Sequence, residues 1–180
     1  MTRVLNLYGG PCVGKSTLAA GITFMMKTAG YNVELVTEVA KDYVWENSKI
    51  IFNNQLYLTT NQYHNMFRLK EYADFIITDA PLLNCAAYFP DDYPDCVMET
   101  VKWMHDQFDN TNFYIDRVIP YNPKGRKHSE EESKLVDARI RHLLTEYEVS
   151  YQIVDANDNT AKRLSSLLID RLEMLNAEPT

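Results

Sequence analysis

The sequence predicts an α/β fold in which one parallel sheet of five strands is flanked by helices. Short apolar runs alternate along the chain with longer segments of helical periodicity, which is typical of parallel strands joined by helical crossovers. The apolar runs are continuous rather than alternating with polar residues, as in strands that are buried on both faces. Hydrophobic residues make up 46% of the 180 residues, enough for a single domain over 1–180 to bury a core without disulfides.

The first half of the chain contains three expected strands and two expected helices. Residues 4–8 form an apolar run that ends in glycines, and residues 15–28 repeat apolar side chains at helical spacing. The run "NVELVTE" at 32–38 is the second strand. Residues 53–73 contain no Gly or Pro and predict one long helix. The run "DFIITDAP" at 74–81 is the third strand, which its proline ends.

The second half continues the alternation. Residues 95–108 place apolar side chains on one side of a helix, and "NFYIDRV" at 112–118 is the fourth strand. Two prolines, a glycine and several basic side chains in 119–133 indicate a mobile basic loop. A helix at about 130–147 follows it. The chain ends with a fifth strand at 149–156 and a last helix that begins near Thr160.

A candidate site follows from this arrangement. In parallel α/β sheets, ligands gather outside the carboxyl ends of the strands. Polar or conformationally permissive residues stand at the ends of all five expected strands, and they are Gly9, Glu38, Asp79, Arg117 and Asp155.

The segment "GGPCVGKST" at Gly9–Thr17 matches the spacing G-x-x-x-x-G-K-[ST] between an expected strand and an expected helix. Glycines allow successive backbone N–H groups to point at phosphate oxygens, and the helix N-terminus adds partial positive charge. Lys15 can reach the β- and γ-phosphates, Ser16 can bind Mg²⁺, and Thr17 can bond the α-phosphate. A chance match in a glycine-rich turn is the alternative. The expected nucleotide-binding residues are Gly10, Pro11, Cys12, Val13, Gly14, Lys15, Ser16 and Thr17, which predicts a P-loop NTPase that binds ATP.

Asp79 is the second half of this pattern, because a carboxylate at the end of a buried strand can approach Mg²⁺ directly or through water. A helix-capping aspartate is the other interpretation. Ala80 follows Asp79 where oligomeric ATPases usually carry a glutamate, and no N-K-x-D sequence of guanine-reading GTPases occurs. The pattern therefore favours phosphoryl transfer to an acceptor, while a non-catalytic nucleotide switch stays open.

A positive clamp for the transferring phosphoryl is expected in a lid at about 117–133. Lys124, Arg126 and Lys127 lie in it, and Arg117 stands at the end of the preceding strand. Arg117 and Arg126 are the stronger candidates, since a planar guanidinium fits phosphate oxygens. A solvated surface loop is the alternative for each of them.

Several segments together resemble small P-loop kinases of the nicotinamide riboside kinase-like and deoxynucleoside kinase-like families. They are "GGPCVGKST", "ELVTEVAKDY", the helix around Gln62, "IITDAPLL" and the basic loop containing Gly-Arg. The resemblance implies an ATP- and Mg²⁺-dependent kinase of a nucleoside, a nucleotide or a related heterocycle. It implies that Glu38 approaches the acceptor hydroxyl, with Asp42 one helical turn beyond, and that Gln62 reads a base. A plain surface glutamine is the alternative for Gln62.

The sequence leaves more than one acceptor open and also bears on where the protein acts. The chain also resembles small kinases of bacterial viruses, some of which phosphorylate hydroxymethylated pyrimidines in DNA. The net charge of −7 weighs against a DNA acceptor, whereas the basic loop leaves it open. Cys12, Cys85 and Cys96 form no metal or redox spacing, and no apolar run reaches membrane-spanning length. We therefore expect a cytoplasmic protein, in the host cytoplasm if viral, with no membrane partner; a homodimer stays open.

Overall fold

A computed structural model of the chain describes residues 2–46, 48–118 and 129–177. Its centre is a five-stranded parallel sheet with the strand order β2-β3-β1-β4-β5. The strands are β1 (Arg3–Tyr8), β2 (Val33–Val36), β3 (Phe75–Thr78), β4 (Asp109–Ile115) and β5 (Gln152–Val154). The helices are α1 (Lys15–Thr28), α2 (Val39–Trp45), the 3-10 helix η1 (Lys49–Asn53), α3 (Gln55–Phe67), α4 (Leu82–Ala86), α5 (Asp95–Asp106), α6 (Glu130–Glu146) and α7 (Asp158–Ala177). The predicted three-layer α/β fold is confirmed.

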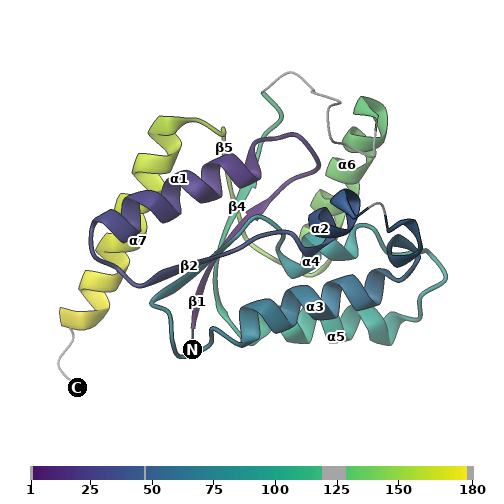
Figure 1. Cartoon of the computed structure of the whole chain (residues 1–180), viewed down its shortest axis with the longest axis horizontal. Coiled ribbons are helices and arrows are strands. Elements are labelled where there is room, and N and C mark those ends of the chain that lie inside the picture. Colours follow the sequence, from purple (N-terminus) through teal and green to yellow (C-terminus); the bar gives the residue numbers. More distant parts are fainter. Residues whose placement is uncertain (1, 47, 119–128, 178–180) are drawn as a thin grey trace.

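Helices cover both faces of the sheet (Figure 1). On one face, α1 and α7 pack against each other over aliphatic side chains such as Ile22 and Leu168. On the other face, α3, α4, α5 and α6 enclose a core that includes Phe89 and Phe108. We call these the α1/α7 layer and the α3–α6 layer. In the described part of the chain, no helix combines the length and apolarity that a membrane crossing would need.

The strand β4 begins earlier and ends earlier than the sequence predicts. Its first residues, "DNTN", are polar, yet they pair with β1 from the register Arg3–Asp109 onward. The side-chain amide of Asn6 donates to Oδ1 of Asn110 at 2.7 Å and of Asn112 at 2.9 Å. These amide contacts across strands compensate for the burial of polar groups, which is why a polar segment belongs to the strand.

Two helical segments also differ from the prediction. The expected helix over 53–73 starts at Gln55, where the Asn54 side chain caps it, and ends at Phe67. Beyond Phe67 the chain closes i→i+3 turns and Glu71 adopts a φ of +72°, which α-helical geometry excludes. The second difference is α4, which begins directly behind Pro81. The strand β3 itself ends at Thr78, so this proline opens the helix and lies three residues beyond the end of the strand.

Candidate functional site

A pocket of about 350 Å³ opens beside the loop that joins β1 to α1. Residues 11–17, which form most of this loop and the start of α1, line one side of the pocket. The opposite wall is built from side chains of α2, η1, α3 and the turn after α4, among them Glu38, Lys41, Trp45, Phe52, Gln55 and Tyr88. The pocket therefore has one side made of a tight loop and another made of helical side chains.

The backbone of the loop is strongly curved. Gly9 and Gly14 have φ angles of +139° and +94°, which favour glycine, and Cys12 adopts a φ of +64° although it carries a side chain. A Cβ at Gly9 would lie 2.9 Å from Cγ2 of Val13 and 3.1 Å from the carbonyl oxygen of Ile115. Gly14 immediately precedes α1, so the helix N-terminus and its unpaired N–H groups face the pocket.

Lys15 is folded back over this loop. Its Nζ donates to the carbonyl oxygens of Gly9 at 2.6 Å and Gly10 at 2.7 Å. These contacts hold the ammonium group against the loop, beside the pocket that Lys15 also lines. The neighbouring Ser16 and Thr17 are exposed and line the same space.

Gly10 is the one predicted loop residue that is not among the described residues lining the pocket. It packs against α6 instead, where its N–H donates to Oδ1 of Asp137 at 2.6 Å. A Cβ at Gly10 would lie 2.6 Å from that oxygen and 2.9 Å from the carbonyl oxygen of Ser133. The second glycine of the loop is therefore required by the close approach of α6.

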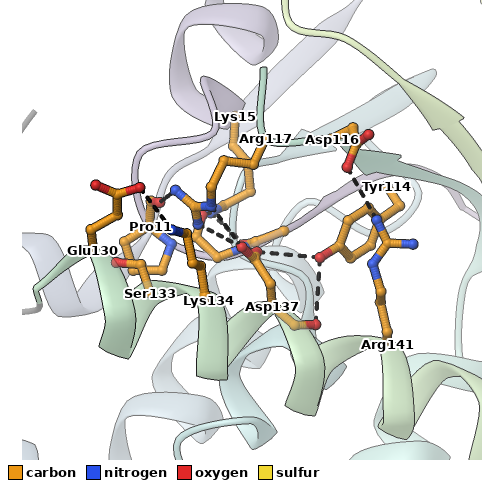
Figure 2. A network of polar contacts seen from close by, with 12 residues as sticks. Pro11, Lys15, Tyr114, Asp116, Arg117, Glu130, Ser133, Lys134, Asp137 and Arg141 are labelled. Carbon is orange, nitrogen blue, oxygen red and sulfur yellow. Dashed lines mark hydrogen bonds and ion pairs between the residues drawn. The ribbon is translucent and has the colours of Figure 1, made fainter. Parts of the chain in front are cut away.

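Arg117 lies two residues beyond the end of β4, and its guanidinium is turned to the loop and α6 (Figure 2). Nε and Nη2 bind Oδ2 of Asp137 at 2.8 Å and 2.7 Å, and Nη1 donates to the carbonyl oxygen of Pro11 at 2.9 Å. We expected Arg117 to reach a transferring phosphoryl. The structure instead uses its guanidinium to join two parts of the protein, and Arg117 is not among the described residues that line the pocket.

Glu38 and Asp79 both lie near enough to Cys85 for their charges to affect the pKa of its thiol. Glu38 is the N-cap of α2, but its side chain makes no capping bond within the described chain, and it lines the pocket. Burial raises the pKa of the Cys85 thiol to about 12, and the charges of Glu38 and Asp79 add to this rise while Lys15 opposes it. The charges of the two predicted carboxylates and of the lysine thus all act on Cys85, in the short helix α4.

The residues present fit a magnesium ion. Asp79 is only 3% exposed, and its Oδ1 has no hydrogen-bond partner among the described residues. Such a buried carboxylate oxygen needs a partner, and a cation would supply one. Asp79 is not among the described residues that line the pocket, whereas Ser16 is. The described residues contain no group of three or more metal-binding side chains. Mg²⁺ usually takes one or two protein ligands together with phosphate oxygens and water.

The structure places the other two predicted substrate residues away from the pocket. Gln62 is 1% exposed; its side chain accepts from the N–H of Val39 at 3.1 Å and donates to Oγ1 of Thr78 at 3.3 Å. It therefore connects α3 to the start of α2 and the end of β3, rather than facing a base. Asp42 is exposed on α2, and neither residue is among the described residues that line the pocket.

Most of the predicted lid lies outside the described residues. Arg126, with Lys124 and Lys127, falls in this part, so its expected contact with a phosphoryl group stays a prediction. The described end of the lid is the start of α6, where Ser129 and Glu132 form a capping box.

Sequence reasoning missed Asn84 and Asp137. Oδ1 of Asn84 accepts from the N–H of Gly9 at 3.1 Å, so α4 supports the first residue of the loop. A lone amide in the apolar run "LLNCA" was the available signal. Asp137 offered none, because an acid on a charged helix is usually a solvated residue.

The fold and the loop define a P-loop nucleotide-binding protein. The family model described as "AAA domain" matches residues 4–163, and the chain belongs to this family. Membership in this family establishes the type of domain. It does not identify the reaction, which has to be inferred from the other residues of the site. No curated protein matches the sequence.

Solved structures share the fold at low identity. A deoxyadenosine kinase from M. mycoides, with the products dCMP and dCDP bound, has a TM-score of 0.57 and 19% identity, over 95% of this chain and 99% of that one. The NadR protein, in complex with NAD and AMP-PNP, has a TM-score of 0.63 and 16% identity, over 86% of this chain and 44% of that one. The YorR protein from Bacillus subtilis, in complex with phosphorylated GDP, has a TM-score of 0.54 and 14% identity, over 98% and 99%. The predicted resemblance to small P-loop kinases is confirmed for the fold.

Proposed function

We propose that this protein is an ATP-dependent kinase that transfers the γ-phosphate to a hydroxyl or phosphate of a nucleoside, a nucleotide or a related heterocycle. The observation that carries the proposal is the two-sided pocket, in which a phosphate-binding loop faces a wall of carboxylate, cationic and aromatic side chains. A nucleotide hydrolase or switch needs no second wall that binds an acceptor. The structures that share the fold include a deoxyadenosine kinase with its products, which supports the same class of reaction.

The loop side is the donor half of the site. Backbone N–H groups at the start of α1 and the Lys15 ammonium bind the triphosphate, whose charged oxygens replace the carbonyls that Lys15 now contacts. Ser16 and Asp79 are the residues that would hold Mg²⁺, directly or through water. When bound, the ion neutralises charge on the phosphates. Within the predicted lid, we keep Arg126 as the candidate for contact with the transferring phosphoryl.

The opposite wall is the acceptor half. Glu38 orients the acceptor hydroxyl and accepts its proton, because it lines the pocket at the start of α2, where its carboxylate can meet the acceptor. Trp45, Phe52 and Tyr88 offer aromatic faces on which a planar base can stack. Lys41 adds a positive charge on the same side, which suits an acceptor that already carries a phosphate.

A second candidate acceptor is a hydroxymethylpyrimidine within DNA. One observation favours it: at α2 and η1, Trp45 and Ile50 are 71% and 85% exposed. Apolar side chains in the open near a pocket can stack on the neighbours of a base that has been turned out of a strand. We rank this second because the chain carries a net charge of −7. In either case we expect the reaction to take place in the cytoplasm.

The test is a panel of acceptors incubated with Mg²⁺ and γ-labelled ATP. Nucleosides, nucleoside monophosphates, nicotinamide riboside and DNA with or without hydroxymethylpyrimidine are compared. Label in a nucleoside or nucleotide, absent with Lys15→Ala, supports the proposal, and label only in modified DNA selects the second candidate. ATP binding without transfer to any acceptor would instead indicate a nucleotide-dependent switch. Glu38→Gln should lower turnover more than ATP affinity.

A further inference from the structure

Asp137 is placed where α6 meets the nucleotide loop, 127 residues after its nearest loop contact. Both of its carboxylate oxygens are used (Figure 2). Oδ1 accepts from the N–H of Gly10 at 2.6 Å and from the hydroxyl of Tyr114 at 3.2 Å. Oδ2 accepts from Nε of Arg117 at 2.8 Å and forms an ion pair with Nη2 at 2.7 Å. One side chain thus joins α6 to β4, to the segment after β4 and to the loop.

Arg117 completes the connection, because its third nitrogen, Nη1, donates to the carbonyl oxygen of Pro11 at 2.9 Å. Asp137 and Arg117 therefore hold an N–H and a C=O of consecutive loop residues from the same side. Their side chains are 16% and 15% exposed, so water and salt screen this pair less than a surface pair. Charge-assisted hydrogen bonds of this kind are also the stronger class.

The bonds from Asp137 and Arg117 hold the part of the loop that contains its strained backbone. Cys12, the next residue after Pro11, holds a left-handed φ of +64°, which costs a residue with a side chain about 1 kcal/mol and persists only where its surroundings impose it. The carbonyl of Gly10, to which Lys15 donates, belongs to the peptide between Gly10 and Pro11. The backbone that Asp137 and Arg117 fix is therefore the backbone that supports the lysine.

We propose that Asp137 is a positioning residue for nucleotide binding: with Arg117 it holds Gly10 and Pro11 in the curved form of the loop that accepts phosphates. It acts through the loop and does not touch the nucleotide. The proposal rests on nucleotide binding by the loop, and it is independent of the acceptor. It also assigns a role to Arg117, whose positive charge offsets the carboxylate that would otherwise stand uncompensated beside an anionic ligand.

Two other ion pairs of α6 contain no residue of the nucleotide loop. Arg139 contacts Asp91 at 3.0 Å, and Asp91 is 94% exposed in that pair. Glu130 and Lys134 form an i,i+4 pair on the surface of the helix. Asp91→Asn is therefore a matched control that removes one carboxylate charge and one ion pair to α6 while leaving the loop contacts intact.

The experiment measures Mg-ATP binding to the full chain by calorimetry, with thermal unfolding recorded without nucleotide. We expect Asp137→Ala to raise the Kd for ATP about tenfold or more, as loss of charge-assisted bonds implies. Asp137→Asn, which keeps an acceptor oxygen for Gly10 and Tyr114, should weaken binding less. Asp91→Asn should bind as the wild type does. Because no transfer is measured, the result does not depend on the kinase assignment.

The opposite charges of Arg117 and Asp137 allow a second test with a double variant. Arg117→Ala leaves the carboxylate at the loop without its cation and should weaken ATP binding most. Adding Asp137→Asn to Arg117→Ala removes that charge and should recover part of the affinity. Wild-type affinity in a folded Asp137→Asn or Asp137→Ala protein overturns the proposal. So does a double variant that binds ATP more weakly than Arg117→Ala alone.

Discussion

The α1/α7 layer and the α3–α6 layer cover the same sheet but differ in what they bury. Between α1 and α7 the core is almost wholly aliphatic, and the buried polar residues described on these two helices are the short side chains Thr160 and Ser165. The α3–α6 layer buries a core with several aromatic side chains, together with more polar groups, of which Gln62, Asn84 and His105 are larger than threonine. The polar groups include Thr59, Gln62, Asn84, His105 and Ser133.

The difference reflects the position of the site. A buried polar group destabilises the fold unless it is hydrogen-bonded, and in the α3–α6 layer these bonds hold elements of the site. Asn84 supports Gly9, Gln62 supports the start of α2, and Asp137 supports the loop. The α1/α7 layer carries the helix that follows the loop, and apolar packing is sufficient for that.

The largest effect should come from Lys15, at the point where α1 leaves the loop. Lys15→Ala removes a preorganised cation from the donor half, and we expect a loss of at least about 3 kcal/mol of transition-state stabilisation, roughly a hundredfold in kcat/KM. Steady-state kinetics measure it. Lys27→Ala, at the other end of α1, breaks only an exposed ion pair with Glu34 and should leave kinetics unchanged. Near-normal turnover of Lys15→Ala would refute the donor assignment.

The buried histidine of the α3–α6 layer should make stability depend on pH. His105 is 5% exposed, and burial lowers its pKa to about 4, with Lys102 adding to the decrease and Asp106 opposing it. In the unfolded chain the pKa of His105 is near 6.5, so between pH 4 and 6.5 this side chain binds a proton in the unfolded state and stays neutral in the folded state. Stability is therefore full above about pH 6.5 and falls as the pH decreases to 4, by up to about 3 kcal/mol.

Urea unfolding at a series of pH values measures this dependence. His105→Gln should flatten the curve between pH 4 and 6.5, whatever its stability at neutral pH. His64→Gln changes an exposed histidine on α3 and should keep the wild-type slope. If His105→Gln also keeps it, the buried histidine is not the source of the acid sensitivity.

A third effect concerns the contact between the loop and α6. Gly10→Ala places a methyl group 2.6 Å from Oδ1 of Asp137 and 2.9 Å from a backbone oxygen of α6. Hydrogen bonds to Gly10, Tyr114 and Arg117 hold the Asp137 carboxylate in place, and the other neighbour is backbone, so we expect a loss of about 2 kcal/mol in the free energy of unfolding. Chemical denaturation measures it. An unchanged midpoint would mean that α6 can withdraw from the loop without cost.

A substitution in the acceptor half of the pocket should have a smaller effect, and it should change the KM for the acceptor. Trp45→Ala removes an aromatic face from the pocket, and we expect the KM for the acceptor to rise about tenfold, as the loss of one stacked base implies. The affinity for ATP should not change, because Trp45 belongs to the opposite side. Trp103→Ala is the control, since this exposed tryptophan lies on α5 outside the described pocket lining. Equal effects of both variants would exclude stacking in the pocket.

Features that depend on local sequence can be predicted from it, whereas contacts between residues far apart in the chain cannot. The strands and loop residues 11–17 depend on local signals, namely continuous apolar runs and a fixed spacing of glycine, lysine and serine. Asp137 and Asn84 act through partners far along the chain, and no local pattern reveals such a pairing. Gln62 shows the limit of resemblance: the expected glutamine is present, but its side chain bonds the backbone of α2.

The smallest expected effect lies in the α1/α7 layer and has the opposite sign. Gly21 is inside α1 without a positive φ, and a Cβ there would lie 3.4 Å from Cβ of Ala161, an ordinary contact. Gly21→Ala therefore gains helix propensity without a clash, and we expect up to about 1 kcal/mol of added stability. The midpoint of chemical denaturation should rise, whereas Gly10→Ala lowers it. A loss in Gly21→Ala would show that α1 and α7 are packed as tightly as α6 and the loop, because only a clash can outweigh the helix propensity of alanine at this position.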